Sequence, residues 1–181
     1  MPKNNIFIVE NKDEEKFLRK KAIPFDFEKW KKSEIAELIR GMRKTMREAD
    51  GIGLSANQIG ESFRMFVAEV PGEAGKKFYA LFNPTIEKTI GEKILLEEGC
   101  LSVPGSYGAV PRYEEVVLRG QDKNGKSVKI KAWGLLAHVF QHETDHLDGK
   151  LFIDKAEEVR NGPRSDRLKK RESRTNSAKK E

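Results

Sequence analysis

Apolar residues recur along the first third of the chain with the period of a helix. Residues 33–50 place isoleucine, leucine or methionine at positions 35, 38, 39, 42 and 46, after a serine suited to cap a helix. The next segment, GIGLSANQIG (51–60), contains glycines and an asparagine that favour a turn. The pattern therefore predicts an amphipathic helix that ends in a turn.

Shorter apolar runs predict strands in the middle of the chain. RMFVAEV (64–70) and FYALFNP (78–84) have strand composition, and KILLEEGCLSVPG (93–105) reads as a strand that enters a loop. Residues 114–133 carry Asn-Gly at the centre of two alternating runs, which predicts a hairpin. A second helix is expected to begin near Gly134. We therefore predict a single-domain α+β fold, with mixed or antiparallel strands around a central helix and the N-terminal helix packed against them.

Composition narrows the class of protein. The 181 residues are 37% hydrophobic and 35% charged, which is typical of a globular domain with a polar surface. No run of about 18 apolar residues is present, so a membrane span is not expected. The first ten residues lack the apolar region of a signal peptide, which favours a cytoplasmic location, although a processed organellar form would look the same. The single cysteine excludes a disulfide within the chain.

The net charge of +6 is concentrated at the C-terminus. Ten of the 35 lysines and arginines lie beyond residue 154, against five of the 29 acidic residues. We therefore predict a folded domain over residues 1–154 and a basic, partly helical or disordered tail over residues 155–181.

All three histidines lie in one segment, at positions 138, 142 and 146. Residues 142–146 form an HExxH pentapeptide, which on a helix directs two imidazoles at one metal ion and places a glutamate beside it. Such pentapeptides also occur by chance, and helix histidines also serve in packing. Two imidazoles leave an ion short of ligands, so a third ligand is expected elsewhere. Three residues spread over about 12 Å of helix do not converge readily, so His138 is expected at the rim of the site.

Cys100 is the alternative third ligand. It lies in the stretch EEGCLSVPG, which the pattern places at the end of a strand. Most free cysteines are small buried apolar residues, and Cys100 taken alone fits that interpretation too.

Three segments together resemble the peptide deformylase family. They are GIGLSANQ (51–58), EGCLS (98–102) and QHETDHLDG (141–149), in the order and spacing of that family. The resemblance implies one divalent metal ion held by Cys100, His142 and His146, with a water or hydroxide as fourth ligand. It further implies Fe²⁺ in the cell, with Zn²⁺, Ni²⁺ or Co²⁺ able to occupy the site of purified protein.

The resemblance also implies the reaction. A metal-dependent hydrolase would remove the formyl group from the N-terminal formyl-methionine of nascent polypeptides and release formate. Glu143 would move the proton, and the side chain of Gln58 and the backbone N–H of Leu101 would hold the oxyanion. The positions that match the family's substrate contacts are Ile52, Gly53 and Gly99 for the peptide backbone and Leu135 and Val139 for the methionine side chain.

Two positions differ from the residues common in the family, and three others are candidates for a role near the site. Ser55 stands where alanine is common, and His138 stands where relatives carry an apolar residue or arginine. Tyr107 is either a loop aromatic or part of the substrate path. The nearness of their motifs suggests a pair between Arg112 and Asp145 that steadies the histidine helix.

Two other classes of protein share some of these features. A zinc protease would share HExxH but needs a downstream ligand, and no histidine follows His146. A non-catalytic RNA-binding protein would explain the basic tail but not the three motifs. The tail itself is either a solvated end or a contact to the ribosome, and neither a membrane nor DNA is expected as a partner.

Overall fold

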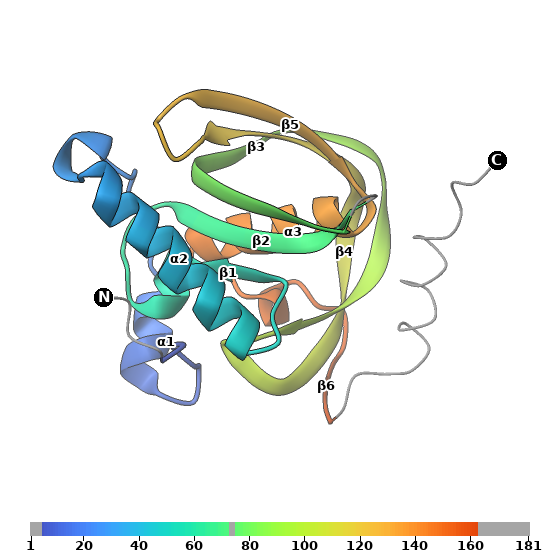
Figure 1. Ribbon diagram of the computed structural model, residues 1–181. Coiled ribbons are helices and arrows are strands. Elements are labelled where there is room, and N and C mark those ends of the chain that lie inside the picture. The colour runs from blue at the N-terminus through green and yellow to red at the C-terminus, as the bar shows by residue number, and fades with distance from the viewer. Residues whose placement is uncertain (1–4, 73–74, 163–181) are drawn as a thin grey trace.

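The computed structural model describes residues 5–72 and 75–162. Its strands form one antiparallel sheet in the order β1 (Gly53–Ser55), β2 (Met65–Gly72), β3 (Gly75–Cys100), β4 (Val103–Gln121) and β5 (Ser127–Trp133), and β6 (Val159–Asn161) pairs with β4. Helix α3 (Gly134–Leu147) packs against strands β1 to β5, which curve around it (Figure 1). The predicted α+β class is therefore confirmed, with antiparallel pairing throughout the described sheet.

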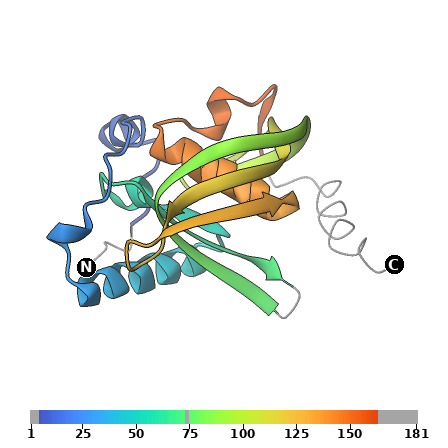
Figure 2. The same cartoon turned by 90° about the horizontal axis from the view of Figure 1, so that it is seen from above.

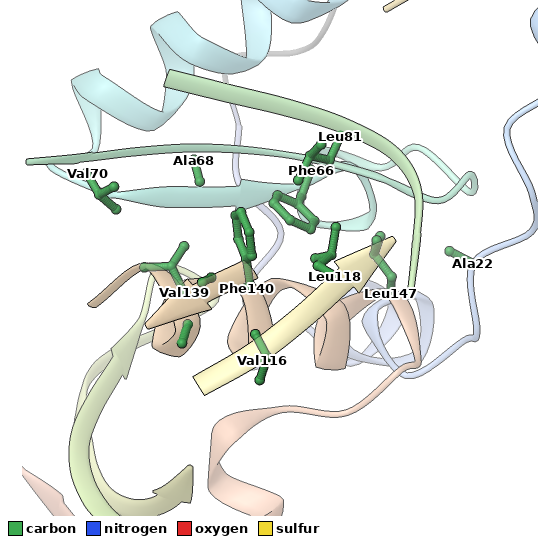
Figure 3. Packing of buried hydrophobic residues seen from close by; sticks show 12 residues of the cluster. Ala22, Phe66, Ala68, Val70, Leu81, Val116, Leu118, Val139, Phe140 and Leu147 are labelled. Carbon is green, nitrogen blue, oxygen red and sulfur yellow. The ribbon is translucent and has the colours of Figure 1, made fainter. Parts of the chain in front are cut away.

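Strand β2 separates two apolar cores because both of its faces are buried. Phe66, Ala68 and Val70 face α3, where the ring of Phe66 lies 5.6 Å from that of Phe140 (Figure 3). Met65 and Val67 face the opposite way, toward helix α2 (Lys32–Glu48). Helices α2 and α3 accordingly lie on opposite sides of β2 (Figure 2). Burial on both faces explains why the run has no polar alternation.

Helix α2 corresponds to the helix predicted at residues 33–50. Its start is held by the side chain of Glu34, which accepts a 2.7 Å hydrogen bond from the backbone N–H of Lys31. Its end is marked by Asp50, which has a φ of +54°, ahead of the glycine-rich turn. The apolar positions of the pattern supply the buried face, namely Ile35, Leu38, Met42 and Met46.

Strands β3 and β4 are longer than the sequence pattern suggested. The runs at 78–84 and 93–105 were expected as separate strands, but most of both lies in the single strand β3. Irregularities in the β3–β4 register, between Phe82 and Thr85 for example, interrupt the pairing along its length. Such irregularities bend a strand and increase its twist, which allows one sheet to surround α3 and to bring Cys100 back to that helix.

Other described elements include the predicted hairpin and several that the pattern did not predict. The β4–β5 turn is closed by Asp122, whose carboxylate accepts hydrogen bonds from the backbone of Asn124 and Lys126. Helix α1 (Lys12–Leu18) was not predicted; Asn11 caps it, and Leu18 is its only buried residue. Three short 3-10 helices, also not predicted, are η1 (Phe27–Lys29), η2 (Ala56–Ile59) and η3 (Phe152–Asp154).

Strand β6 lies within the segment predicted as tail. Its three residues pair with residues 106–108 of β4, so the folded body continues past residue 154 through the last described residues. Residues 163–181, which carry most of the predicted tail, lie outside the described part of the chain. None of the helices in the described residues has the length and apolar character needed to span a membrane.

Candidate metal centre

Three side chains converge at the end of β3 and the middle of α3. The Sγ of Cys100 lies 3.1 Å from Nε2 of His146, and this nitrogen lies 3.2 Å from Nε2 of His142. The three candidate ligand atoms all lie within 4.8 Å of one another. Ligands of a tetrahedral ion at ordinary metal–sulfur and metal–nitrogen distances stand about 3.3–3.6 Å apart. The donor set and its spacing therefore fit a divalent transition-metal ion.

The electrostatics of this cluster favour a cation. Burial raises the pKa of the Cys100 thiol, but the nearby charge of His146 and hydrogen bonds from both histidines outweigh it and lower this pKa to about 5. Burial also opposes charge on His142, yet Cys100 and Glu98 raise its pKa well above the usual value. A thiolate at this position is the form of cysteine that binds metals.

Glu98 orients one of the two imidazoles. Its Oε2 lies 2.8 Å from Nδ1 of His142, on the side of the ring opposite Nε2. A carboxylate in this place fixes the tautomer and orientation of a ligating histidine. Burial opposes the charge of Glu98, but hydrogen bonds from His138, His142 and Arg112 hold its pKa far below the usual range. No role was predicted for Glu98 from the sequence, although its place two residues before the cysteine put it near the site.

The carboxylate of Glu143 lies beside the cluster. It is buried, and its Oε2 accepts a 2.6 Å hydrogen bond from Oγ of Ser55, the last residue of β1. Burial raises its pKa, while the positive charge of the two neighbouring histidines acts against the rise. Gly53 leaves room for it, since a Cβ at that position would lie 2.2 Å from Oε1 of Glu143. From the sequence, Gly53 was expected to let a substrate backbone approach closely. The room that the carboxylate of Glu143 needs is a second reason for a glycine at this position.

Gln58 is held with its amide NH₂ toward the cluster. Its Oε1 accepts a 2.8 Å hydrogen bond from the backbone N–H of Ser55. Its Nε2 lies 3.1 Å from Oγ of Ser102 and 3.7 Å from Sγ of Cys100. The side chain is almost fully buried, so these contacts fix which end of the amide faces the sulfur. Neither serine had been predicted as a site residue.

The cluster opens into a groove of about 450 Å³. Its walls come from the turn at residues 49–53, the end of β3 with the loop after it, and one face of α3. The predicted site residues that line it are Ile52, Gly53, Gln58, Gly99, Cys100, Leu101, Leu135, Val139, His142 and Glu143. His146 lies behind this wall and is almost fully buried. A larger cavity, of about 630 Å³, lies elsewhere and holds none of these residues.

Three further predictions concern residues near the groove. His138 lines the groove and contacts Glu98 rather than the metal cluster of the described residues, as expected from its helical spacing. Tyr107 also lines the groove, which agrees with the interpretation that it forms part of the substrate path. The predicted pair of Arg112 and Asp145 is confirmed, with Nη1 and Oδ2 2.5 Å apart.

Comparison with known proteins gives concordant results. A family model described as polypeptide deformylase matches residues 7–162. A peptide deformylase of Syntrophobacter fumaroxidans is 49% identical over 122 residues, which cover 67% of this chain and 71% of the relative. One of Syntrophomonas wolfei is 46% identical over 143 residues, covering 79% and 89%.

Solved structures agree with this match. A peptide deformylase of Synechococcus elongatus in complex with actinonin superposes with a TM-score of 0.76 at 37% identity, covering 87% of this chain and 81% of that one. A peptide deformylase of Thermotoga maritima gives 0.74 at 34% identity, covering 85% and 97%.

Proposed function

This chain belongs to the peptide deformylase family and removes the N-formyl group from nascent peptides, and we propose how its own residues carry out that hydrolysis. The observation that carries the proposal is the convergence of Cys100, His142 and His146 beside the buried carboxylate of Glu143. These three residues hold one divalent ion. When bound, the ion supplies a Lewis acid and lowers the pKa of water enough to make a nucleophile near neutral pH.

Glu143 serves as the proton carrier. Ser55 occupies its Oε2, which leaves Oε1, the oxygen beside Gly53, to receive the proton of the attacking water. The same oxygen then gives the proton to the amine nitrogen as the formyl C–N bond breaks, so formate and a free amine leave. The raised pKa of this buried carboxyl suits a group that must both accept and donate a proton.

Gln58 and Leu101 hold the negative charge that develops on the formyl oxygen. The Nε2 of Gln58 already points toward the cluster, where one hydrogen faces Oγ of Ser102 and the other makes a long contact of 3.7 Å to Sγ of Cys100. The formyl oxygen takes the place of the sulfur as the acceptor of this second hydrogen. Leu101 follows directly after Cys100 and lines the same groove, and its backbone N–H is the second donor in this proposal. Preorganised donors of this kind stabilise a transition state without moving during the reaction.

The peptide substrate binds between two strand edges. Strand β1 has β2 as its one partner among the described strands, and its first residue, Gly53, lines the groove together with Ile52 just before it. Gly99 in β3 pairs with Tyr107 of β4 on one side and borders the groove. An extended peptide adds to such edges by backbone hydrogen bonds. The methionine side chain packs against Leu135 and Val139, the apolar part of the α3 wall.

The identity of the ion and the place of action complete the proposal. Thiolate and imidazole ligands suit several transition metals, and the family resemblance favours Fe²⁺ in the cell, with Zn²⁺, Ni²⁺ or Co²⁺ as substitutes in purified protein. The substrate, a formylated nascent chain, places the enzyme in the cytoplasm beside the ribosome.

A direct assay tests the proposed reaction. Purified protein is incubated with a formyl-Met tripeptide and, separately, with its acetyl-Met analogue, and released formate and acetate are measured. We expect formate release and little acetate, because the larger acyl group must fit beside Gly53, Gln58 and Leu101 in the same wall. Absence of formate release from protein loaded with Fe²⁺ or Co²⁺ would contradict the proposal.

The basic C-terminus supplies a contact to the ribosome in this proposal. Residues 163–181 are rich in lysine and arginine, and phosphate contacts would make their binding weaken steeply with salt. A chain ended after Gly162 keeps β6, so it should retain activity on a short peptide but co-sediment less with ribosomes at low salt. If the two chains co-sediment equally with ribosomes, the tail does not contact the ribosome and is a solvated end.

A further inference from the structure

His138, the histidine outside the ligand cluster, contacts the carboxylate that supports the cluster. It lies one helical turn before His142 on α3, and its Nε2 stands 2.8 Å from Oε1 of Glu98. Only 13% of its side chain is exposed. A histidine on a groove wall that made no specific contact would leave its ring nitrogens to solvent, whereas one nitrogen here is committed to a buried carboxylate.

The carboxylate of Glu98 is fully used as an acceptor. Oε1 lies 2.5 Å from Nε of Arg112 and 2.8 Å from His138, while Oε2 lies 3.0 Å from Nη2 of Arg112 and 2.8 Å from Nδ1 of His142. Each oxygen therefore has one contact from β4 and one from α3. The side chain is 1% exposed, so water does not compete for these contacts.

The contacts from β4 are themselves anchored. Nη1 of Arg112 lies 2.5 Å from Asp145 on α3, and Asp145 lies 2.6 Å from Nζ of Lys155. The guanidinium is thus fixed in its plane, and it directs the plane of the Glu98 carboxylate. The terminal torsion of a glutamate is otherwise broad, so its orientation depends on such partners.

We infer that His138 is a positioning residue for the metal ligand His142 and acts through Glu98. By donating to Oε1 from the helix side, His138 completes the set of bonds that keeps Oε2 aimed at Nδ1 of His142. The bond from His142 to Oε2 in turn directs Nε2 of that ring toward Cys100 and His146. The inference rests on the proposed function, because it assumes that these three residues hold a metal.

Two variants separate hydrogen bonding from packing. In His138→Gln the amide NH₂ reaches about as far as the imidazole Nε2 and can still donate to Glu98, whereas His138→Leu fills similar space without a donor. Zinc affinity is measured by competition with a chelator, and the absorption spectrum of the Co²⁺-loaded protein reports the ligand geometry. Turnover number and KM for a formyl-Met tripeptide are measured in parallel.

We expect the leucine variant to bind zinc about tenfold more weakly than wild type, to shift the Co²⁺ spectrum and to lose kcat with little change in KM. The glutamine variant should stay close to wild type in all three. If the leucine variant does not fold, His138→Ala removes the same donor and is expected to show the same losses.

Three outcomes would overturn the inference. Equal zinc affinity and unchanged Co²⁺ spectra in all variants would show that the bond to Glu98 does not support the site. A rise in KM alone, or equal losses in the glutamine and leucine variants, would make His138 a wall of the peptide groove. Wild-type protein that binds no zinc would instead refute the proposed function, which distinguishes the two failures.

Discussion

The hydroxyl of Ser55 donates a hydrogen bond of 2.6 Å to Oε2 of Glu143 and lies 3.0 Å from the backbone carbonyl oxygen of the same residue. A hydroxyl has one hydrogen, so the two acceptors compete for it, and the shorter contact identifies the carboxylate as the main partner. A residue of the short strand β1 thus fixes the proton carrier on α3, although 88 positions separate the two in sequence.

This contact predicts a modest role for Ser55. In Ser55→Ala, the carboxylate of Glu143 loses one bond but keeps its place beside Gly53, so kcat should fall by about tenfold, the lower end of the cost of one hydrogen bond to a charged group. Metal content should not change. Ser33→Ala, at an exposed position of α2, is the matched control. A loss as large as that from removing Glu143 would mean that Ser55 takes part in the chemistry.

Glu143 itself carries the strongest prediction. Glu143→Gln preserves size and a hydrogen-bonding group but cannot accept a proton, so turnover should fall by roughly 10²-fold or more while metal content stays at the wild-type level. Glu37→Gln, at an exposed position of α2, controls for the change in charge. Activity near wild type in the Glu143 variant would remove this residue from the mechanism.

Cys100 is expected to determine both activity and sensitivity to oxidation. Cys100→Asp offers the ion a harder ligand, so the variant should still bind metal but lose most of its turnover. A thiolate bound to iron is open to oxidation, and peroxide should inactivate the wild-type iron form faster than the variant. If peroxide inactivates both forms at comparable rates, the assignment of the Cys100 sulfur as a metal ligand loses its main support.

A buried carboxylate outside the groove predicts how stability depends on pH. Glu69 on β2 accepts hydrogen bonds from Nε and Nη2 of Arg47, at 2.9 and 2.8 Å, and from Arg43. The bonds from Arg47 and then Arg43 outweigh burial and lower the pKa of Glu69 from 4.5 to about 2. The folded state therefore binds this proton less readily than the unfolded state does. The resulting stability is complete above pH 4.5 and is lost as the pH falls toward 2.

Urea unfolding of Glu69→Gln tests this dependence. At pH 7 the variant should be less stable than wild type by about 1–2 kcal/mol, since the arginines are partly exposed and their charges are screened. The difference should shrink as the pH is lowered from 5 to 2. A difference that stays constant over this range would show that packing, and not the charge of Glu69, accounts for the loss.

Local patterns predicted the elements whose cause is local. The period of apolar residues located α2, and the four-residue spacing of His142 and His146 placed both imidazoles on one face of the helix expected from Gly134. Cys100 was joined to them only through the family resemblance, since no local rule connects the end of a strand to a helix more than 40 residues later.

The features that were missed depend on contacts distant in sequence. The irregular pairing that bends β3 around α3 is set by the tertiary structure, and the three residues of β6 carry too little pattern to be recognised. Helix α1 buries a single residue, so it lacks an apolar stripe. The four contacts of Glu98 join β3, β4 and α3, so no local pattern predicts them, although its place two residues before Cys100 put it near the site.

The central claim, that this chain hydrolyses formyl peptides through a metal held by Cys100, His142 and His146, is tested most directly by metal content and formate release measured on the same anaerobically purified sample. The account predicts about one divalent ion per chain, formate release from a formyl-Met tripeptide, loss of both after chelation, and recovery of both when Fe²⁺ is restored. Full formate release from metal-free protein would contradict it.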